Sequence, residues 1–222
     1  DRPLFRALRT VSPGGSASRT IVRLPGNSTV WDSLPDGRLL LAQTDDHGVL
    51  MAKVAGDTTE RDLSWLDAPA LEDLSADGKW VLFSEYGQGG GRDNAAYLRA
   101  TDGSAAIRLG SGRALALSPD AKWAICGPTP FPPWPYLEVV PTGAGQSRRL
   151  EAQGLSYNRA RCLADGKRII VSANEPDRLA RLFVHDLSTA RPVPITPEGA
   201  GLFVVSPNGA TVAVKFGSAI RL

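Results

Sequence analysis

Residues 71–109, LEDLSADGKWVLFSEYGQGGGRDNAAYLRATDGSAAIRL, contain the clearest structural repeat of this chain. A short strand leads into an Asp-Gly turn, a strongly apolar strand over residues 80–85 leaves it, and a third strand over residues 96–100 follows a polar loop. A second Asp-Gly turn and a last strand that ends at Leu109 complete the unit. The pattern predicts a four-stranded antiparallel meander.

The first turn of this unit occurs five times along the chain, as LPDGR, SADGK, SPDAK, LADGK and SPNGA. Its third and fourth residues are Asp36, Gly37, Asp77, Gly78, Asp120, Ala121, Asp165, Gly166, Asn208 and Gly209. The third residues of successive copies are 41, 43, 45 and 43 positions apart, a period typical of a propeller blade and not of a helical repeat. The sequence therefore predicts an all-β fold, a β-propeller of four-stranded antiparallel blades with about five repeat units.

One copy of the turn has no glycine at its fourth position. Glycine accepts the positive φ that such turns require, whereas an L-residue resists it. Ala121 stands at this position in SPDAK, so we expect it to store roughly 1 kcal/mol of strain if the turn is preserved. Ala121→Gly is then expected to stabilise the fold.

The repeat also sets the expected domain organisation, which is a single propeller domain or propeller segment over residues 1–222. Its parts are a half-blade at 1–26, blades at about 27–69, 70–110, 111–151 and 152–197, and a partial blade at 198–222. Both end pieces look like cut blades that cannot bury their apolar faces alone. We therefore expect a segment of a larger propeller, with a closed five-bladed ring as the alternative.

Composition narrows the possible partners. The net charge is +2 and the basic residues are scattered, so nucleic acid is not an expected partner. The sequence has no apolar run near the roughly 20 residues of a membrane span, so we expect no direct membrane insertion. Cys126 and Cys162 form no Cys-x-x-Cys pair, and we expect no metal or cofactor. They lie beside turns of successive units, either as two buried thiols or as an inter-blade disulfide.

The most unusual segment is PTPFPPWPY, residues 128–136. Its prolines favour an extended conformation, and Phe131, Trp134 and Tyr136 add aromatic surface of the kind that dominates binding hot spots. One interpretation is an exposed loop that contacts a partner. The other is that Phe131 and Trp134 fold back over an apolar blade edge.

Other polar or glycine-rich stretches favour structural roles. The glycines of residues 87–91 lack a following helix or Lys-Ser/Thr pair, so a hairpin loop is favoured over a phosphate cradle. Residues 45–47, Asp-Asp-His, can bind a cation, but their hairpin position favours a solvated loop. His47 and His185 accompany no Gly-x-Ser-x-Gly elbow and no His-Glu-x-x-His motif, and we expect a protein that is not an enzyme.

The chain resembles a known family over essentially its whole length. The turns, with strands such as YLRATDGSAAIRL and LFVHDLSTARPVPIT, resemble the WD-repeat-like, TolB-like propeller repeats of bacterial proteins. The segments VWDSLPDGRLLLAQ, ERDLSWLDAPALEDLSADGKWVLFSE, AIRLGSGRALALSPDAKWA and PITPEGAG are similar to propeller regions C-terminal to the kinase domain of bacterial receptor-like serine/threonine kinases. The chain itself carries no kinase signature.

This resemblance implies a non-catalytic scaffold or sensor module that binds a protein or a small ligand outside the cytoplasm, as the sensor region of a membrane-anchored kinase would. One alternative is an accessory propeller that gates substrate entry to a serine peptidase. Another is a free-standing TolB-like periplasmic scaffold. The same sequence repeat occurs in propellers of all three kinds, and a fold does not determine a function, so the repeat does not distinguish among them.

Overall fold

The computed structural model describes residues 5–12, 14–15, 18–25, 27–44, 47–54, 56–128, 131–151, 154–189 and 191–221. The regular structure of these residues is antiparallel β-sheet, with one short 3-10 helix, η1 (Gln88–Gly90). The chain divides into two compact units, residues 1–47 and residues 48–222. The all-β fold class predicted from the sequence is confirmed.

The first unit consists of two hairpins. Strand β1 (Phe5–Val11) pairs with β2 (Ser18–Pro25), and β3 (Asn27–Ser33) pairs with β4 (Leu39–Thr44). The first copy of the repeated turn joins β3 to β4, as its sequence predicts.

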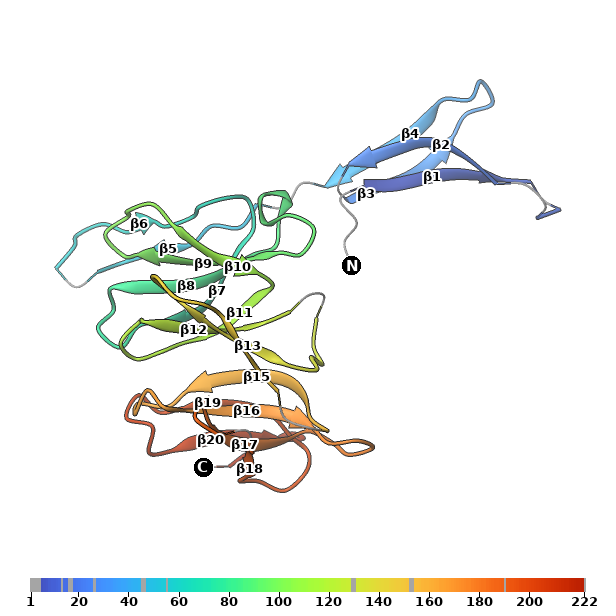
Figure 1. The fold of residues 1–222 in the computed structure, drawn as a ribbon. Helices are drawn as coiled ribbons and strands as arrows, with labels where there is room; N and C mark the ends of the chain where they lie inside the picture. Colours follow the sequence, from blue (N-terminus) through green and yellow to red (C-terminus); the bar gives the residue numbers. More distant parts are fainter. Residues whose placement is uncertain are drawn as a thin grey trace. The chain divides into compact units, whose positions relative to one another are not determined.

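The second unit is a succession of antiparallel sheets that follow one another in chain order, from cyan to red in Figure 1. A two-stranded pair comes first, then three four-stranded sheets, then a three-stranded sheet. The strands are β5 (Met51–Ala52) and β6 (Arg61–Asp62); β7 (Pro69–Leu74), β8 (Trp80–Glu85), β9 (Ala95–Ala100) and β10 (Ile107–Ser111); β11 (Arg113–Leu117), β12 (Trp123–Gly127), β13 (Leu137–Pro141) and β14 (Arg148–Leu150); β15 (Ser156–Cys162), β16 (Arg168–Asn174), β17 (Arg181–Asp186) and β18 (Val193–Pro194); β19 (Ala200–Val205), β20 (Val212–Phe216) and β21 (Ala219–Arg221).

The four-stranded meander predicted for residues 71–109 is confirmed by the sheet β7 to β10. The three four-stranded sheets lie close to the blades expected at 70–110, 111–151 and 152–197. Residues 27–69 contribute β3 and β4 to the first unit and β5 and β6 to the second. The blade boundaries, and the expectation of a larger propeller, stay predictions.

The three copies of the turn that begin with serine have the same side-chain hydrogen bonds. In the SADGK copy the Ser75 hydroxyl donates to the Asp77 carboxylate at 2.7 Å and accepts from the Trp80 backbone N–H at 2.9 Å. The SPDAK and SPNGA copies repeat both bonds from Ser118 and Ser206. A short serine or threonine side chain that bonds locally competes with the sheet ladder and favours a turn.

Ala121 occupies this turn in the conformation that its neighbours reach with glycine. Its φ is +55°, in the left-handed region, where Gly78 has φ of +71°. The turn hydrogen bond from the Ala121 N–H to the Ser118 carbonyl is intact at 2.8 Å. The strain expected from the sequence is therefore present in the fold.

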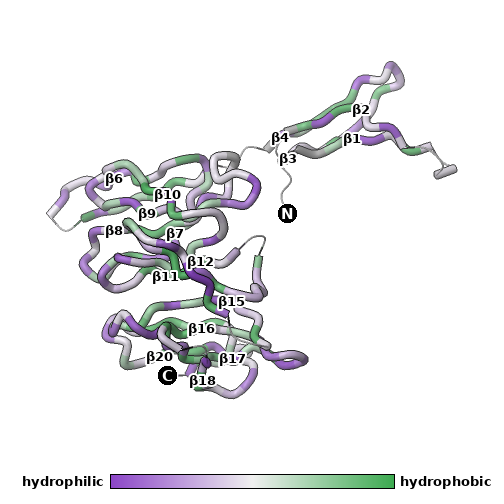
Figure 2. Tube along the Cα trace, in the orientation of Figure 1, coloured by the Kyte–Doolittle hydropathy of each residue, from purple (hydrophilic) through white to green (hydrophobic). Residues whose placement is uncertain are grey.

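The hydrophobic core lies between consecutive sheets. Four clusters fill the spaces between the sheets of the second unit, and each combines residues of two neighbouring sheets. Figure 2 shows the apolar residues of this unit gathered on its strands. Because no sheet buries its faces alone, neighbouring sheets stabilise one another, as expected for a propeller.

The first strands of neighbouring sheets are also joined by polar side chains. The Asp73 carboxylate on β7 accepts from the Leu117 backbone N–H on β11 at 2.8 Å. The Arg161 guanidinium on β15 donates to the Leu115 carbonyl on β11. Both first strands that supply these side chains carry a β-bulge, which turns side chains out of the regular alternation.

The two cysteines are free thiols, so the inter-blade disulfide considered for them is not formed. Cys126 is buried in the core between β7–β10 and β11–β14, and burial raises the pKa of its thiol to about 12. A thiol with so high a pKa is protonated at neutral pH and behaves as a small apolar side chain.

Candidate functional site

The candidate site lies on the loops that join the second and third strands of the four-stranded sheets. Because strands alternate in direction, these loops lie at the end of the sheets opposite to the Asp-Gly turns. They are the loops over residues 86–94, 128–136 and 175–180, and we call this end the loop face. Residues 129 and 130 lie outside the described part of the chain.

Trp134 belongs to the core and not to the surface of this face. Its side chain is 1 % exposed and packs in the cluster between β11–β14 and β15–β18. The backbones of Trp134 and Tyr157 exchange two hydrogen bonds, at 2.8 and 2.7 Å. A Cβ at Gly127 would lie 2.8 Å from the indole ring, so glycine leaves the space that the ring fills. The folded-back interpretation holds for Trp134, and the exposed one does not.

Phe131 is the aromatic residue of the segment that the loop face presents. Its side chain is 48 % exposed, and its ring stacks on Tyr86 with centroids 6.4 Å apart and an interplanar angle of 11°. The Tyr86 hydroxyl lies 3.2 Å from the Glu72 carboxylate, to which it donates. The Arg113 guanidinium lies 5.9 Å from the centroid of the Tyr86 ring. Phe131 therefore rests on a supported aromatic platform.

The platform is held by a partly buried ion pair between Glu72 and Arg113. The Glu72 carboxylate, with its side chain only 8 % exposed, accepts from Arg113 at 3.0 and 3.3 Å. It also accepts from the Ser84 hydroxyl at 3.3 Å. Burial, together with the Glu72 charge, raises the pKa of Tyr86 to about 12, which keeps the phenol protonated as a hydrogen-bond donor. The polar groups of Arg113 and Tyr86 both hydrogen-bond to Glu72, and such a network holds its members in place. The arrangement therefore suits support of the Phe131 ring more than proton transfer.

Tyr136, the third aromatic residue of the segment, is separated from this platform. It is half-buried beside the last strand of its sheet, where the Arg149 guanidinium lies 4.2 Å from its ring centroid. The structure thus distributes Phe131, Trp134 and Tyr136 among three environments: the platform, the core and the outer edge of a sheet. The binding role expected for the three stays a prediction. Because Trp134 is buried in the core, only Phe131 and Tyr136 have side-chain surface to offer a partner.

The sequence did not indicate the residues that support Phe131, which are Tyr86, Glu72 and Arg113. Glu72 and Arg113 lie on the first strands of adjacent sheets, 41 residues apart, whereas Asp77 and Asp120 in the turns of the same two sheets are 43 residues apart. Because the pair does not keep this period, the repeat alone does not identify it. The contact of Phe131 with Tyr86 also follows no periodic signal.

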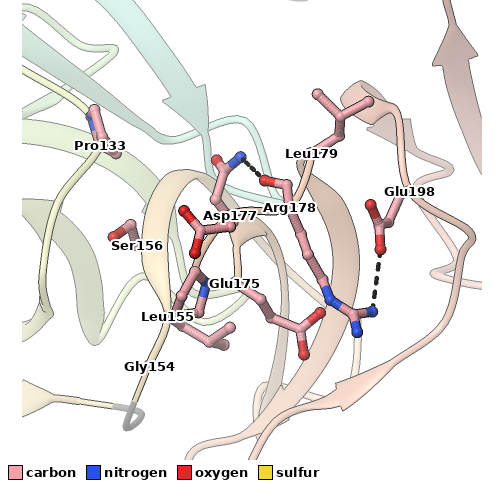
Figure 3. A pocket seen from close by; sticks show the side chains of 11 residues that line it. Pro133, Gly154, Leu155, Ser156, Glu175, Asp177, Arg178, Leu179 and Glu198 are labelled. Atoms are coloured by element: carbon pink, nitrogen blue, oxygen red, sulfur yellow. Dashed lines mark hydrogen bonds and ion pairs between the residues drawn. The ribbon is translucent and has the colours of Figure 1, made fainter.

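A cleft of about 730 Å³ opens beside Pro133 on the same face (Figure 3). Its other lining residues are Gly154, Leu155, Ser156, Asn174, Glu175, Pro176, Asp177, Arg178, Leu179 and Glu198. Its volume lies within the range of sites that hold small ligands or peptide side chains.

The loop that forms one wall of the cleft is held by polar contacts. The Asn174 amide donates to the Arg178 carbonyl at 3.0 Å, and Arg178 forms an ion pair with Glu198 at 3.1 Å (Figure 3). Asp177 has a φ of +59°, a left-handed conformation that is uncommon outside glycine and is often found at binding sites. The cleft combines carboxylates with exposed apolar surface at Leu179.

The remaining candidates have structural surroundings. The Asp67 carboxylate accepts from the Gly89 N–H at 3.1 Å, so the glycine-rich hairpin loop binds a carboxylate of its own chain. His185 is buried, with Nε2 3.0 Å from the Thr189 carbonyl. Asp45 and Asp46 lie outside the described residues. Within the described ranges, no group of three or more metal-ligating side chains comes together.

In the part of the chain that the structure describes, no helix has the length and apolar character needed to cross a membrane. No family model and no curated protein matches the sequence.

The stacked antiparallel sheets and their repeated turns define a β-propeller. The fold is TolB-like, as comparison with solved structures shows. It matches a putative TolB from Agrobacterium tumefaciens with a TM-score of 0.61 and 18 % identity, over 89 % of this chain and 73 % of that one. TolB from Acinetobacter baumannii matches with a TM-score of 0.59 and 19 % identity, over 93 % and 53 % of the two chains.

Two structures of hydrolytic enzymes also share the propeller fold. One comes from a study of two prolyl endopeptidases, with a TM-score of 0.53 and 15 % identity over 84 % of this chain and 32 % of that one. The other is a puromycin hydrolase, with a TM-score of 0.52 and 20 % identity over 94 % and 39 %. This chain spans well under half the length of both.

Proposed function

We propose that this chain is a non-catalytic β-propeller binding module, a scaffold or sensor that engages a protein partner through its loop face. The observation that carries the proposal is the exposed Phe131 ring, stacked on Tyr86 and supported by the half-buried Glu72–Arg113 pair. A partly exposed aromatic ring that is already held by a stacking contact loses little entropy on binding, which favours an interface hot spot.

Two finer assignments belong to this proposal. Similarity of the repeat segments to kinase-associated propellers supports a sensor region of a bacterial membrane-anchored serine/threonine kinase, and the TolB-like fold supports an extracytoplasmic location. In either setting the partner would approach the end of the sheets where Phe131 and the cleft lie.

A second candidate function is an accessory propeller that gates access to a peptidase domain. The observation that favours it is the shared fold with the prolyl endopeptidase and puromycin hydrolase structures. In that case the cleft beside Pro133 would contact a peptide on its way to a hydrolase domain. Both candidates assign binding, and not bond cleavage, to the residues of this chain.

The test uses Phe131→Ala, with Val193→Ala as a matched control because Val193 is an exposed apolar residue on β18. Each purified chain is immobilised and incubated with an extract of the source cells, and retained proteins are quantified. We expect Phe131→Ala to lose proteins that the parent chain and the control both retain, with unchanged melting temperatures. Equal retention by both variants would contradict the role of Phe131, and hydrolysis of a peptide or ester by the isolated chain would contradict the non-catalytic assignment.

A further inference from the structure

A second concave site lies at the other end of the sheets, near the Asp-Gly turns. It is a groove of about 570 Å³ between the sheets β11–β14 and β15–β18. Half-buried Trp123, Val139, Pro141 and Leu187 form its apolar wall, and Arg148 and Lys167 line it with positive charge. We propose that this groove binds an acidic peptide segment, in which a carboxylate lies beside an apolar side chain.

Lys167 differs from the basic residues at the same position of the other turns in its ion pairing. In the equivalent turns Arg38, Lys79 and Lys122 each form an ion pair with the aspartate of the same turn, at 2.7, 3.8 and 3.5 Å. In the fourth turn the next residue, Arg168, pairs with Asp165 at 2.5 Å. Among the described residues Lys167 has no ion pair, so its ammonium group is available to a ligand in the groove.

Arg148 supplies the second positive charge. Its Nη2 donates to the Leu187 carbonyl at 2.8 Å, which places the guanidinium across the groove without neutralising it. In the described part of the chain Arg148 has no carboxylate partner. The Leu187 N–H in turn donates to the Lys167 carbonyl at 3.0 Å, so one backbone segment holds both basic residues at the same groove.

The one carboxylate of the lining, Asp186, does not offset both cations. It accepts from the Ser188 N–H at 2.8 Å and from the Ser188 hydroxyl at 2.6 Å, within its own turn. The groove therefore has an excess of positive charge above an apolar wall. A carboxylate next to an apolar side chain matches both features, and an arginine can bind a carboxylate through two N–H groups.

This site is separate from the loop face, so its test is independent of the proposed function. The probe is a fluorescein-labelled peptide of alternating leucine and glutamate, capped at both ends, and the readout is fluorescence polarisation at low ionic strength. We expect Lys167→Glu to raise Kd about five- to tenfold, because one attractive contact becomes repulsive. Lys122→Glu is the matched control, since Lys122 has the same place in the neighbouring turn but does not line the groove.

A peptide in which glutamine replaces every glutamate distinguishes charge recognition from apolar adsorption. We expect it to bind at least fivefold more weakly, and we expect the affinity of the acidic peptide to fall as salt is raised. A second readout is the indole N–H NMR signal of Trp123, assigned with Trp123→Phe, which should shift only with the acidic peptide. Absence of binding, equal affinity for both peptides, or equal effects of Lys167→Glu and Lys122→Glu would each overturn the proposal.

Discussion

Replacing Ala121 by glycine is expected to stabilise this propeller, although glycine usually weakens a folded protein. Ala121 has a φ of +55°, and an L-residue in the left-handed region costs about 1–2 kcal/mol. Glycine removes this cost but gives the unfolded chain extra freedom, which is worth about 0.4–1 kcal/mol. Loss of the partly buried Ala121 methyl group subtracts a few tenths more. The net gain is about 0.5 kcal/mol, or a rise in Tm of about 1–2 °C.

The matched experiment is Gly78→Ala, which places alanine at the same position of the preceding turn. Gly78 has a φ of +71°, and a Cβ there would have no atom within 4 Å, so only backbone strain opposes the substitution. We expect a loss of about 0.5–1 kcal/mol from Gly78→Ala. Urea unfolding and calorimetry of both variants and the parent measure these differences. A destabilised Ala121→Gly protein, with Gly78→Ala also destabilised, would refute the assignment of strain to Ala121.

The remaining predictions concern buried side chains. Burial lowers the pKa of His185 below its ordinary 6.5, so stability should fall as pH drops below about 6.5. His185→Gln should flatten that part of a plot of Tm against pH. Burial raises the pKa of Glu85 above its ordinary 4.5, so stability should fall as pH rises from 4.5 through the raised pKa. Glu85→Gln should remove that fall in the same measurement of Tm against pH. The buried Tyr157 hydroxyl has no hydrogen-bond partner among the described residues, so Tyr157→Phe should leave stability unchanged or raise it by up to about 1 kcal/mol in urea unfolding. Trp134→Ala should cost about 3–5 kcal/mol by the same assay, and a loss below 1 kcal/mol would contradict its place in the core.

The sequence was a good guide to the sheets because each turn carries its own local chemistry. The serine, aspartate and glycine of SADGK are enough to specify one hairpin. Because copies of this turn recur at a nearly constant spacing, the same hairpin is predicted along the whole chain. Even the exception at Ala121 was predictable, because the conformation of a turn depends mainly on its neighbours in sequence.

The candidate site was less predictable because its contacts join different sheets. The sequence of residues 128–136 marks an aromatic segment but does not say that Trp134 enters the core while Phe131 remains exposed. That choice depends on the space above Gly127 at the end of β12 and on the Tyr86 ring, which follows β8 in the neighbouring sheet. Lys167 illustrates the same limit, since its free charge depends on which of two adjacent basic residues reaches Asp165.

The side-chain bonds between first strands have a consequence for how the propeller unfolds. The Arg113–Glu72, Leu117–Asp73 and Arg161–Leu115 contacts join residues 41, 44 and 46 positions apart. Among the described residues, these bonds connect β11 to its two immediate neighbours, β7 and β15. Opening of one sheet then removes support from the adjacent sheets alone. Amide hydrogen exchange should be slowest in β11, which is fastened on both sides, and should become faster toward β19 to β21.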